Sequence, residues 1–111
     1  MEVFFRNRKL LKLCSSENNM LRDLGRKRAD KLKMRLNELH AMDNLSLIPV
    51  VPPSRCHELA GDRQGQLSVD LDHPYRLIFI PANDPVPLKP DGGLDRTKVT
   101  AVEILEIADT H

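Results

Sequence analysis

Polar side chains that can do acid–base or phosphate chemistry fall into three places in the second half of the chain. The segment Arg55-Cys-His-Glu-Leu-Ala-Gly-Asp-Arg-Gln-Gly65 holds the first group, Arg76 stands in an apolar stretch, and Asp109 and His111 lie at the end. Imidazole and carboxylate groups transfer protons, and guanidinium groups bind phosphate. These residue types permit the cleavage of a phosphodiester without a metal ion.

RNA suits this set of residues because it carries its own nucleophile, the 2′-hydroxyl. A protein then needs a base for the hydroxyl proton, an acid for the leaving oxygen, and cations for the charge that develops on phosphorus. His57 or His111 can serve as base or acid, and Arg63 and Arg76 can serve as the cations. The residues permit this reaction but do not by themselves select it.

Arg76 is the most constrained of these residues, because its neighbours in Tyr75-Arg-Leu-Ile-Phe-Ile80 are apolar. Burying an unpaired arginine costs several kcal/mol, so Arg76 must reach solvent, an acidic partner or an anionic ligand. A salt bridge to Asp70 or Asp72 across a hairpin is a structural alternative that the sequence supports equally well.

Other kinds of chemistry lack a motif. The histidines have no compact spacing, and HExxH, glycine-rich nucleotide loops and G-x-S-x-G are absent, so we expect no metal and no small-molecule cofactor. Cys14 and Cys56 form no CxxC pair or disulfide framework, which suits a reducing compartment. There is no membrane-spanning apolar run and no signal-peptide core, so we expect a cytoplasmic protein without a membrane partner.

The 111 residues fit one domain covering 1–111, and 41% hydrophobic with 30% charged residues is a globular composition. The net charge of +1 is unevenly distributed. Residues 1–60 hold 12 Lys and Arg against 7 Asp and Glu, a net of +5, whereas residues 61–111 hold 5 against 9, a net of −4. A basic lobe can attract a polyanion, although a solvated helix surface explains it equally well.

The first half of the chain is predicted to be a short strand followed by helices. The strand is Val3-Phe-Phe5, and Asn7 can cap a helix over residues 8–15 with Leu10, Leu11 and Cys14 inward. Residues 18–42 carry a helical stripe, which Gly25 interrupts and can split. The stripe comprises Leu21, Leu24, Ala29, Leu32, Leu36 and Leu39, and its polar flanks carry Arg22, Arg26, Arg28, Lys31, Lys33 and Arg35.

The second half is predicted to form a sheet. After a proline-containing linker over 43–56, residues 67–71 and 75–80 form a hairpin, and residues 99–107, apolar on both faces, form a central strand. Residues 81–98 are predicted to be a long loop. The order β-α-α-β-β-β predicts an α+β fold, with two N-terminal helices packed on one face of a mainly antiparallel sheet and the other face left for function.

Four stretches, in order, resemble the HigB-like toxins of the RelE superfamily. Arg55–Gly65 resembles their LHxLKGdrxG signature, and Gln66-Leu-Ser-Val69 resembles their G-x-W-S-I strand start. Tyr75-Arg-Leu-Ile-Phe79 resembles their W/Y-R-I/L-x-F strand, and Asp109-Thr-His111 their terminal D-Y-H. The resemblance covers most of residues 55–111, while the helical half agrees only in pattern and length.

The resemblance implies a RelE-like fold and the toxin of a bacterial or plasmid toxin–antitoxin pair, a plasmid maintenance killer protein. Such toxins cut mRNA on the translating ribosome without a metal, and a cognate HigA-type antitoxin binds and silences them. By position, the resemblance implies an active-site set of His57, Arg63, Arg76, Asp109 and His111. It also implies salt-sensitive contacts to RNA phosphates from Arg22, Arg26, Arg28, Lys31, Lys33, Arg35 and Arg55.

The sequence departs from the family pattern at Ala60, which replaces a lysine, and at Thr110, which replaces an aromatic residue that can stack on a base. Leu67 replaces a tryptophan, a packing change. The first two departures support a second hypothesis: a catalytically silent or altered relative that acts by binding protein. Such a relative would be a killer-suppression partner or a gyrase inhibitor like the ParE branch of the superfamily.

Overall fold

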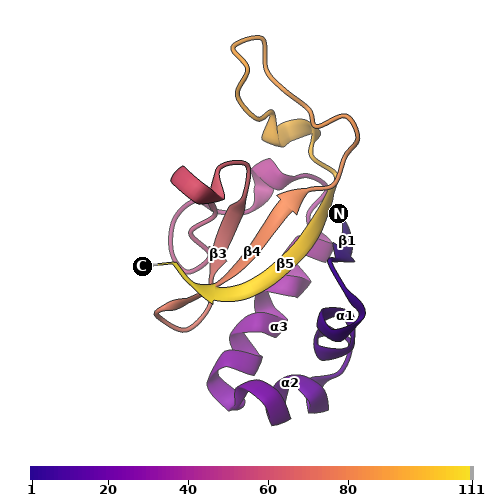
Figure 1. Ribbon diagram of the computed structural model, residues 1–111, viewed down its shortest axis with the longest axis vertical. Helices are drawn as coiled ribbons and strands as arrows, with labels where there is room; N and C mark the ends of the chain where they lie inside the picture. Colours follow the sequence, from indigo (N-terminus) through magenta and orange to yellow (C-terminus); the bar gives the residue numbers. More distant parts are fainter. Residues whose placement is uncertain (111) are drawn as a thin grey trace.

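The computed structural model describes residues 1–110. Its α-helices come before all of its strands except the first (Figure 1). The helical half begins with one strand and ends in a short 3-10 turn: β1 (Glu2–Phe5), α1 (Arg8–Cys14), α2 (Glu17–Leu24), α3 (Arg26–Ala41) and η1 (Leu45–Leu47). The second half contains four strands and two further turns: β2 (His57–Glu58), η2 (Gly61–Arg63), β3 (Leu67–Asp70), β4 (Tyr75–Pro81), η3 (Arg96–Lys98) and β5 (Ala101–Asp109).

The five strands form one sheet in the order β1-β5-β4-β3-β2. β1 pairs with β5 in parallel, and the other three pairings are antiparallel. Strand β5 therefore lies inside the sheet, as its apolar sequence predicts, although it begins at Ala101, two residues later than expected. The expected mainly antiparallel α+β fold is confirmed.

One face of this sheet packs on the helices. Because side chains alternate along a strand, Leu77 and Phe79 of β4 share the helix-covered face, and both are fully buried. Leu32, Leu36 and Leu39 of α3 belong to the same core. Full burial of each such side chain contributes roughly 1.5–3 kcal/mol to stability, and these contacts hold α3 against the sheet.

Gly25 splits the predicted long helix into α2 and α3. Its φ of 79° and ψ of 166° lie where side chains are rarely tolerated, so a glycine allows the chain to turn between two helices. The Asn7 side chain caps α1 as predicted, accepting from the Leu10 N–H at 2.9 Å.

Two predicted core positions are wrong. Leu11 and Leu21 are exposed to 47% and 38%, whereas Leu13 packs against the core and Met20 lies in it. For Leu21 the reason is the break at Gly25, which rotates α2 relative to α3, so a stripe drawn through one straight helix does not hold across it.

The predicted loop over 81–98 extends from the end of the molecule opposite α2 (Figure 1). The Asn83 side chain anchors its base, donating to Thr100 Oγ1 and accepting from the Thr100 N–H, both at 3.0 Å. Leu88 and Leu94 bridge its two arms. None of the helices over residues 1–110 is long and apolar enough to cross a lipid bilayer.

Candidate active site on the open face of the sheet

Strand register brings polar residues from four strands onto the face away from the helices. One row across the sheet runs His57, Ser68, Ile78 and Glu106, each paired with the next. The next row places Arg76 between Asp70 and Ala108. These positions alternate with the core positions Leu77 and Val69, so the rows face away from α3.

Arg76 is only 9% exposed and is surrounded by polar groups. Its guanidinium donates to Thr110 Oγ1 at 3.2 Å and lies 3.3 Å from His57 Nε2. Its Nε is also 3.3 Å from Asp70 Oδ1, an ion-pair contact without hydrogen-bond geometry. The anticipated salt bridge to Asp70 is therefore present, and it offsets the cost of burying the cation.

The hydrogen bonds of His57 define its tautomer. Nδ1 lies 3.0 Å from the Arg55 carbonyl oxygen, which can only accept, so Nδ1 carries the proton. Nε2 then presents its lone pair to the Arg76 guanidinium at 3.3 Å. In this tautomer Nε2 is the atom that can take up a proton.

Arg63 approaches the same face from the η2 turn. Its guanidinium donates to Gln66 Oε1 at 3.0 Å and to Glu106 Oε2 at 3.3 Å. The turn is closed by the Gln66 N–H, which donates to the Arg63 carbonyl at 2.9 Å. Because Glu106 and His57 lie in one register row, the turn brings Arg63 to the row that holds His57.

The end of the chain contributes Thr110 to this face, while Asp109 pairs with Tyr75 in the register and so alternates with Ala108. Thr110 contacts Arg76 where the family pattern has an aromatic residue. His111 lies outside the described residues. Of the five predicted active-site residues, the structure thus brings His57 and Arg76 into contact and places Arg63 beside Glu106 on the same face.

Glu106 was not predicted as a site residue, and Asp70 was expected only as a partner of Arg76. Glu106 interrupts the apolar β5 sequence just as Arg76 interrupts that of β4, and this signal could have identified it. Its carboxylate stands beside Arg63 and is a second proton acceptor on this face.

Arg35 was predicted to be part of the basic surface but is buried, with 2% exposure. Its Nε donates to the Asp70 carbonyl at 2.9 Å, and its guanidinium pairs with Glu38. Ser54 Oγ donates to the other Glu38 oxygen at 2.6 Å. Arg35 therefore joins α3 to β3 and is not available to RNA.

Arg28 and Arg55 also serve the fold. Arg28 forms two hydrogen bonds to Asp72, at 3.0 and 3.3 Å, and lies 3.6 Å above the Tyr75 ring centroid, a cation–π contact. Arg55 pairs with Asp70 at 3.5 Å but is half exposed. Arg28 thus fixes the β3–β4 hairpin to α3.

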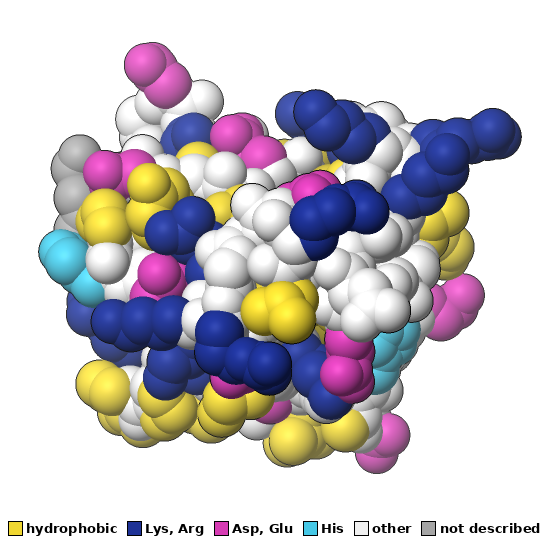
Figure 2. Space-filling model, turned by 90° about the horizontal axis from the view of Figure 1, so that it is seen from below, with side chains coloured by type: hydrophobic (Ala, Val, Ile, Leu, Met, Phe, Trp, Pro, Cys, Tyr) yellow, Lys and Arg dark blue, Asp and Glu magenta, His cyan; other side chains and the backbone are white. Residues whose placement is uncertain are grey.

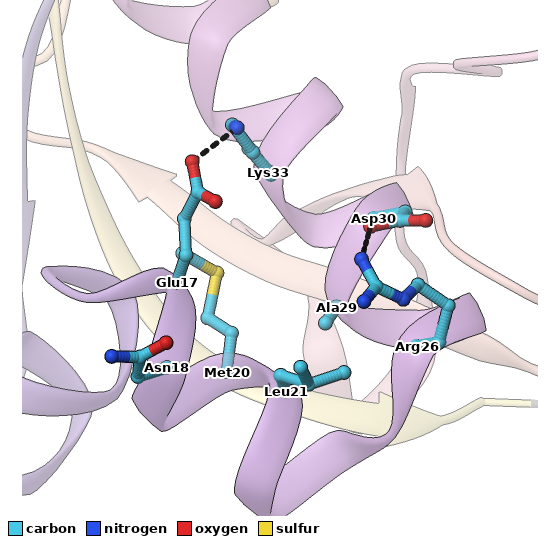
Figure 3. A pocket seen from close by; sticks show the side chains of 8 residues that line it. All are labelled: Glu17, Asn18, Met20, Leu21, Arg26, Ala29, Asp30 and Lys33. Atoms are coloured by element: carbon cyan, nitrogen blue, oxygen red, sulfur yellow. Dashed lines mark hydrogen bonds and ion pairs between the residues drawn. The ribbon is translucent and has the colours of Figure 1, made fainter.

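Of the predicted RNA-binding residues, Arg22, Arg26 and Lys33 are exposed at the end formed by α2 and α3. Figure 2 shows Lys and Arg side chains gathered there with acidic ones between them. Arg26 pairs with Asp30 at 3.8 Å and Lys33 pairs with Glu17, around a hollow of about 280 Å³ between the two helices (Figure 3). A hydrogen bond from Lys33, and then its charge, lowers the pKa of the Glu17 carboxyl. Water screens such exposed pairs, so they add little to stability and a phosphate can displace the carboxylate.

Cys56 adjoins His57 but is not activated. Burial raises the pKa of its thiol to about 11, outweighing the opposite effect of Arg96, so the thiol stays protonated at neutral pH. Within residues 1–110, no group of three His, Cys, Asp or Glu side chains is arranged to hold a metal ion.

No protein-family model matches the sequence, and no curated protein matches it. Among solved structures, the chain is similar to a YoeB/ParE toxin from Agrobacterium tumefaciens, with a TM-score of 0.58 over 100% of both chains. The two sequences are 10% identical, so the likeness concerns the fold. The chain has a toxin fold of the RelE/ParE type, as the resemblance of its motifs implied.

Proposed function

We propose that the chain is a HigB-like toxin of a type II toxin–antitoxin system and cleaves mRNA on the translating ribosome. One observation carries the proposal: His57 of β2, Arg63 of η2 and Arg76 of β4 all lie on the sheet face away from the helices. The similarity in fold to a YoeB/ParE toxin supports the same class.

In the proposed reaction the 2′-oxygen forms a bond to phosphorus and the bond to the 5′-oxygen breaks. The products are a 2′,3′-cyclic phosphate and a 5′-hydroxyl. His57 Nε2 or the Glu106 carboxylate accepts the 2′-hydroxyl proton, since both can act as bases. Arg63 and Arg76 stabilise the charge on the phosphoryl oxygens, and His111 donates the proton that the 5′-oxygen takes up as it leaves.

The basic end of the molecule supports a role in ribosome binding. Arg22, Arg26 and Lys33 are exposed on α2 and α3, and Lys31 and Arg55 are additional cations. Contacts from these side chains to RNA phosphates displace counterions, so binding should weaken as salt rises. The proposed partners are mRNA on the ribosome and a cognate HigA-type antitoxin, met in the cytoplasm.

The test is induced expression in a bacterial host, with growth followed alongside primer extension on abundant mRNAs. Growth arrest with new cuts that disappear when translation is blocked is the expected result. Co-expression of the antitoxin should restore growth. Normal growth with uncut mRNA, from a soluble and folded chain, would overturn the proposal.

A second candidate function is supported by the charges on this face. Arg63 and Arg76 already pair with Glu106 and Asp70, and Thr110 has no ring to stack on a base. A relative with this face occupied could act by binding protein, as a killer-suppression partner or a ParE-like gyrase inhibitor. Stalled gyrase–DNA complexes with intact mRNA would favour it over cleavage.

A further inference from the structure

β1 is an edge strand whose outer side is open. The Glu2 N–H donates to the Thr100 carbonyl at 3.1 Å and the Arg6 N–H to the Ile104 carbonyl at 2.9 Å, so these residues and Phe4 face β5. Because backbone groups alternate along a strand, the N–H and C=O of Val3 and Phe5 point outward. Within residues 1–110, no other strand pairs with this edge, and such an edge is a template for another chain.

The side chains beside this edge are both apolar and charged. Phe4 is 49% exposed, and Glu2 and Arg6 share its face of the strand. Neither Glu2 nor Arg6 makes an ion pair within the described part of the chain. Exposed Leu11 of α1 flanks the strand across an open groove of about 440 Å³.

We propose that the β1 edge binds a second copy of this chain, with the two β1 strands antiparallel about a two-fold axis at Phe4. In this register Val3 of each copy faces Phe5 of the other, and the outward backbone groups of both form hydrogen bonds. Phe4 meets its own counterpart at the closer, non-hydrogen-bonded position, where side-chain contact is greatest.

Charge complementarity selects a second copy. In the same register Glu2 of one chain lies opposite Arg6 of the other, and the symmetry repeats this pair on the far side of Phe4. The sequence Glu-Val-Phe-Phe-Arg is thus complementary to itself when reversed. Pairing therefore creates two Glu2–Arg6 ion pairs that a single chain lacks, and no side chain has to move to the other face of the strand.

The edge is also held in place before it binds. The Met1 nitrogen donates to the carbonyls of Leu39, His40 and Met42, at 3.0, 3.0 and 2.6 Å, and so fastens the start of β1 to the end of α3. A strand ordered in advance loses less conformational entropy on pairing. The dimer proposal is independent of RNA cleavage, because the residues of the edge are not those of the candidate active site.

The test is sedimentation velocity on the full chain up to roughly 1 mM, a range that includes weak dimers. The wild-type chain should show a concentration-dependent dimer. Glu2→Arg and Arg6→Glu each place like charges opposite one another twice, so each should raise the dissociation constant about tenfold or more. Lys27 is exposed on α3, and Lys27→Glu changes the net charge as Arg6→Glu does. This control should leave the dissociation constant unchanged.

Mixing the two variants decides the register. In a mixed pair the arginine introduced in one chain faces the glutamate introduced in the other, and the native Glu2 and Arg6 that remain face each other. The equimolar mixture should therefore dimerise as the wild type does. Circular dichroism checks that each variant is folded. Two results would overturn the proposal. One is a wild-type chain that stays monomeric at every concentration, which would leave the edge to a different partner. The other is a mixture that stays monomeric while the wild type dimerises.

Discussion

Each arginine of the candidate site has an acidic neighbour, and this pairing shapes what the site can do. Arg63 lies against Glu106, and Arg76 lies against Asp70 and beside His57. The pairs hold the guanidinium groups in place, which in the proposed reaction would lower the entropy cost of binding the substrate. A phosphate then competes with a carboxylate for each cation.

The first prediction concerns Arg63, whose side chain is 31% exposed and therefore can be removed without opening the core. If it stabilises the phosphoryl charge, Arg63→Ala should slow mRNA cleavage by about 100-fold. Lys89→Ala, at a side chain that is 53% exposed on the loop over residues 81–98, removes a cation outside both proposed surfaces and is the control that should retain cleavage. Cleavage of a labelled mRNA is the measurement, and equal rates for both variants would exclude Arg63 from the site.

The second prediction concerns the Cys56 thiol, whose pKa burial raises from an ordinary 9.0 to about 11. The unfolded thiol ionises near pH 9.0 and the folded one only near 11, so this residue's contribution to stability is complete below pH 9 and is lost as pH rises to 11. Iodoacetamide should therefore alkylate native Cys56 far more slowly at pH 8 than it does in urea. Mass spectrometry at timed intervals measures this, and equal rates would contradict the burial.

At the scale of the elements, the break between α2 and α3 depends on one residue. Gly25 has a φ of 79°, and no heavy atom lies within 4 Å of where a Cβ would be. Gly25→Ala should therefore act through backbone strain alone and lower the free energy of unfolding by about 1–3 kcal/mol. Urea unfolding followed by circular dichroism tests this, and an unchanged midpoint would mean that the turn relaxes without cost.

A fourth prediction separates structural from exposed arginines on the helices. Arg35→Ala leaves Glu38 and the Asp70 carbonyl without their partner, which should cost about 3 kcal/mol in urea unfolding. Arg22→Ala should change the free energy of unfolding by less than about 0.5 kcal/mol. Similar losses for the two variants would refute the buried role of Arg35.

The β3–β4 hairpin was predictable because its two-residue alternation and the turn at Asp72-His-Pro74 are local signals, whereas the two-residue strand β2 was not predicted. The burial of Arg35 was not, since it depends on Glu38 and on the distant Asp70 carbonyl, which the helical pattern does not contain. Exposed Leu21 has the same cause, because the φ of Gly25 sets the relative rotation of two helices.

For a similar reason, only part of the candidate site could be predicted from the sequence. Its motif residues His57, Arg63 and Arg76 were identified, but Glu106 depends on which residue of β5 lies opposite Ile78. The charge of Glu106 in an apolar strand marks it as a candidate, but a register shift between Ile78 and Phe79 determines its pairing, and the sequence does not reveal that shift.

At the scale of the whole molecule, the basic end and the polar sheet face have separate tasks in the proposed function. In that proposal the cations on α2 and α3 bind the ribosome, and the sheet face acts on the mRNA. Covering only the sheet face would be enough for an antitoxin to prevent cleavage. The free β1 edge lies at the border of the sheet, and pairing of two copies there uses none of His57, Arg63 and Arg76.

The most direct test of the central claim is cleavage of an end-labelled mRNA by the purified chain in a reconstituted translation system. We predict cuts only when ribosomes translate the message, with 2′,3′-cyclic phosphate ends and no cut where a 2′-deoxy nucleotide replaces the attacking one. An mRNA that stays intact beside translating ribosomes and a folded chain, or cuts that persist at the 2′-deoxy position, would contradict the account.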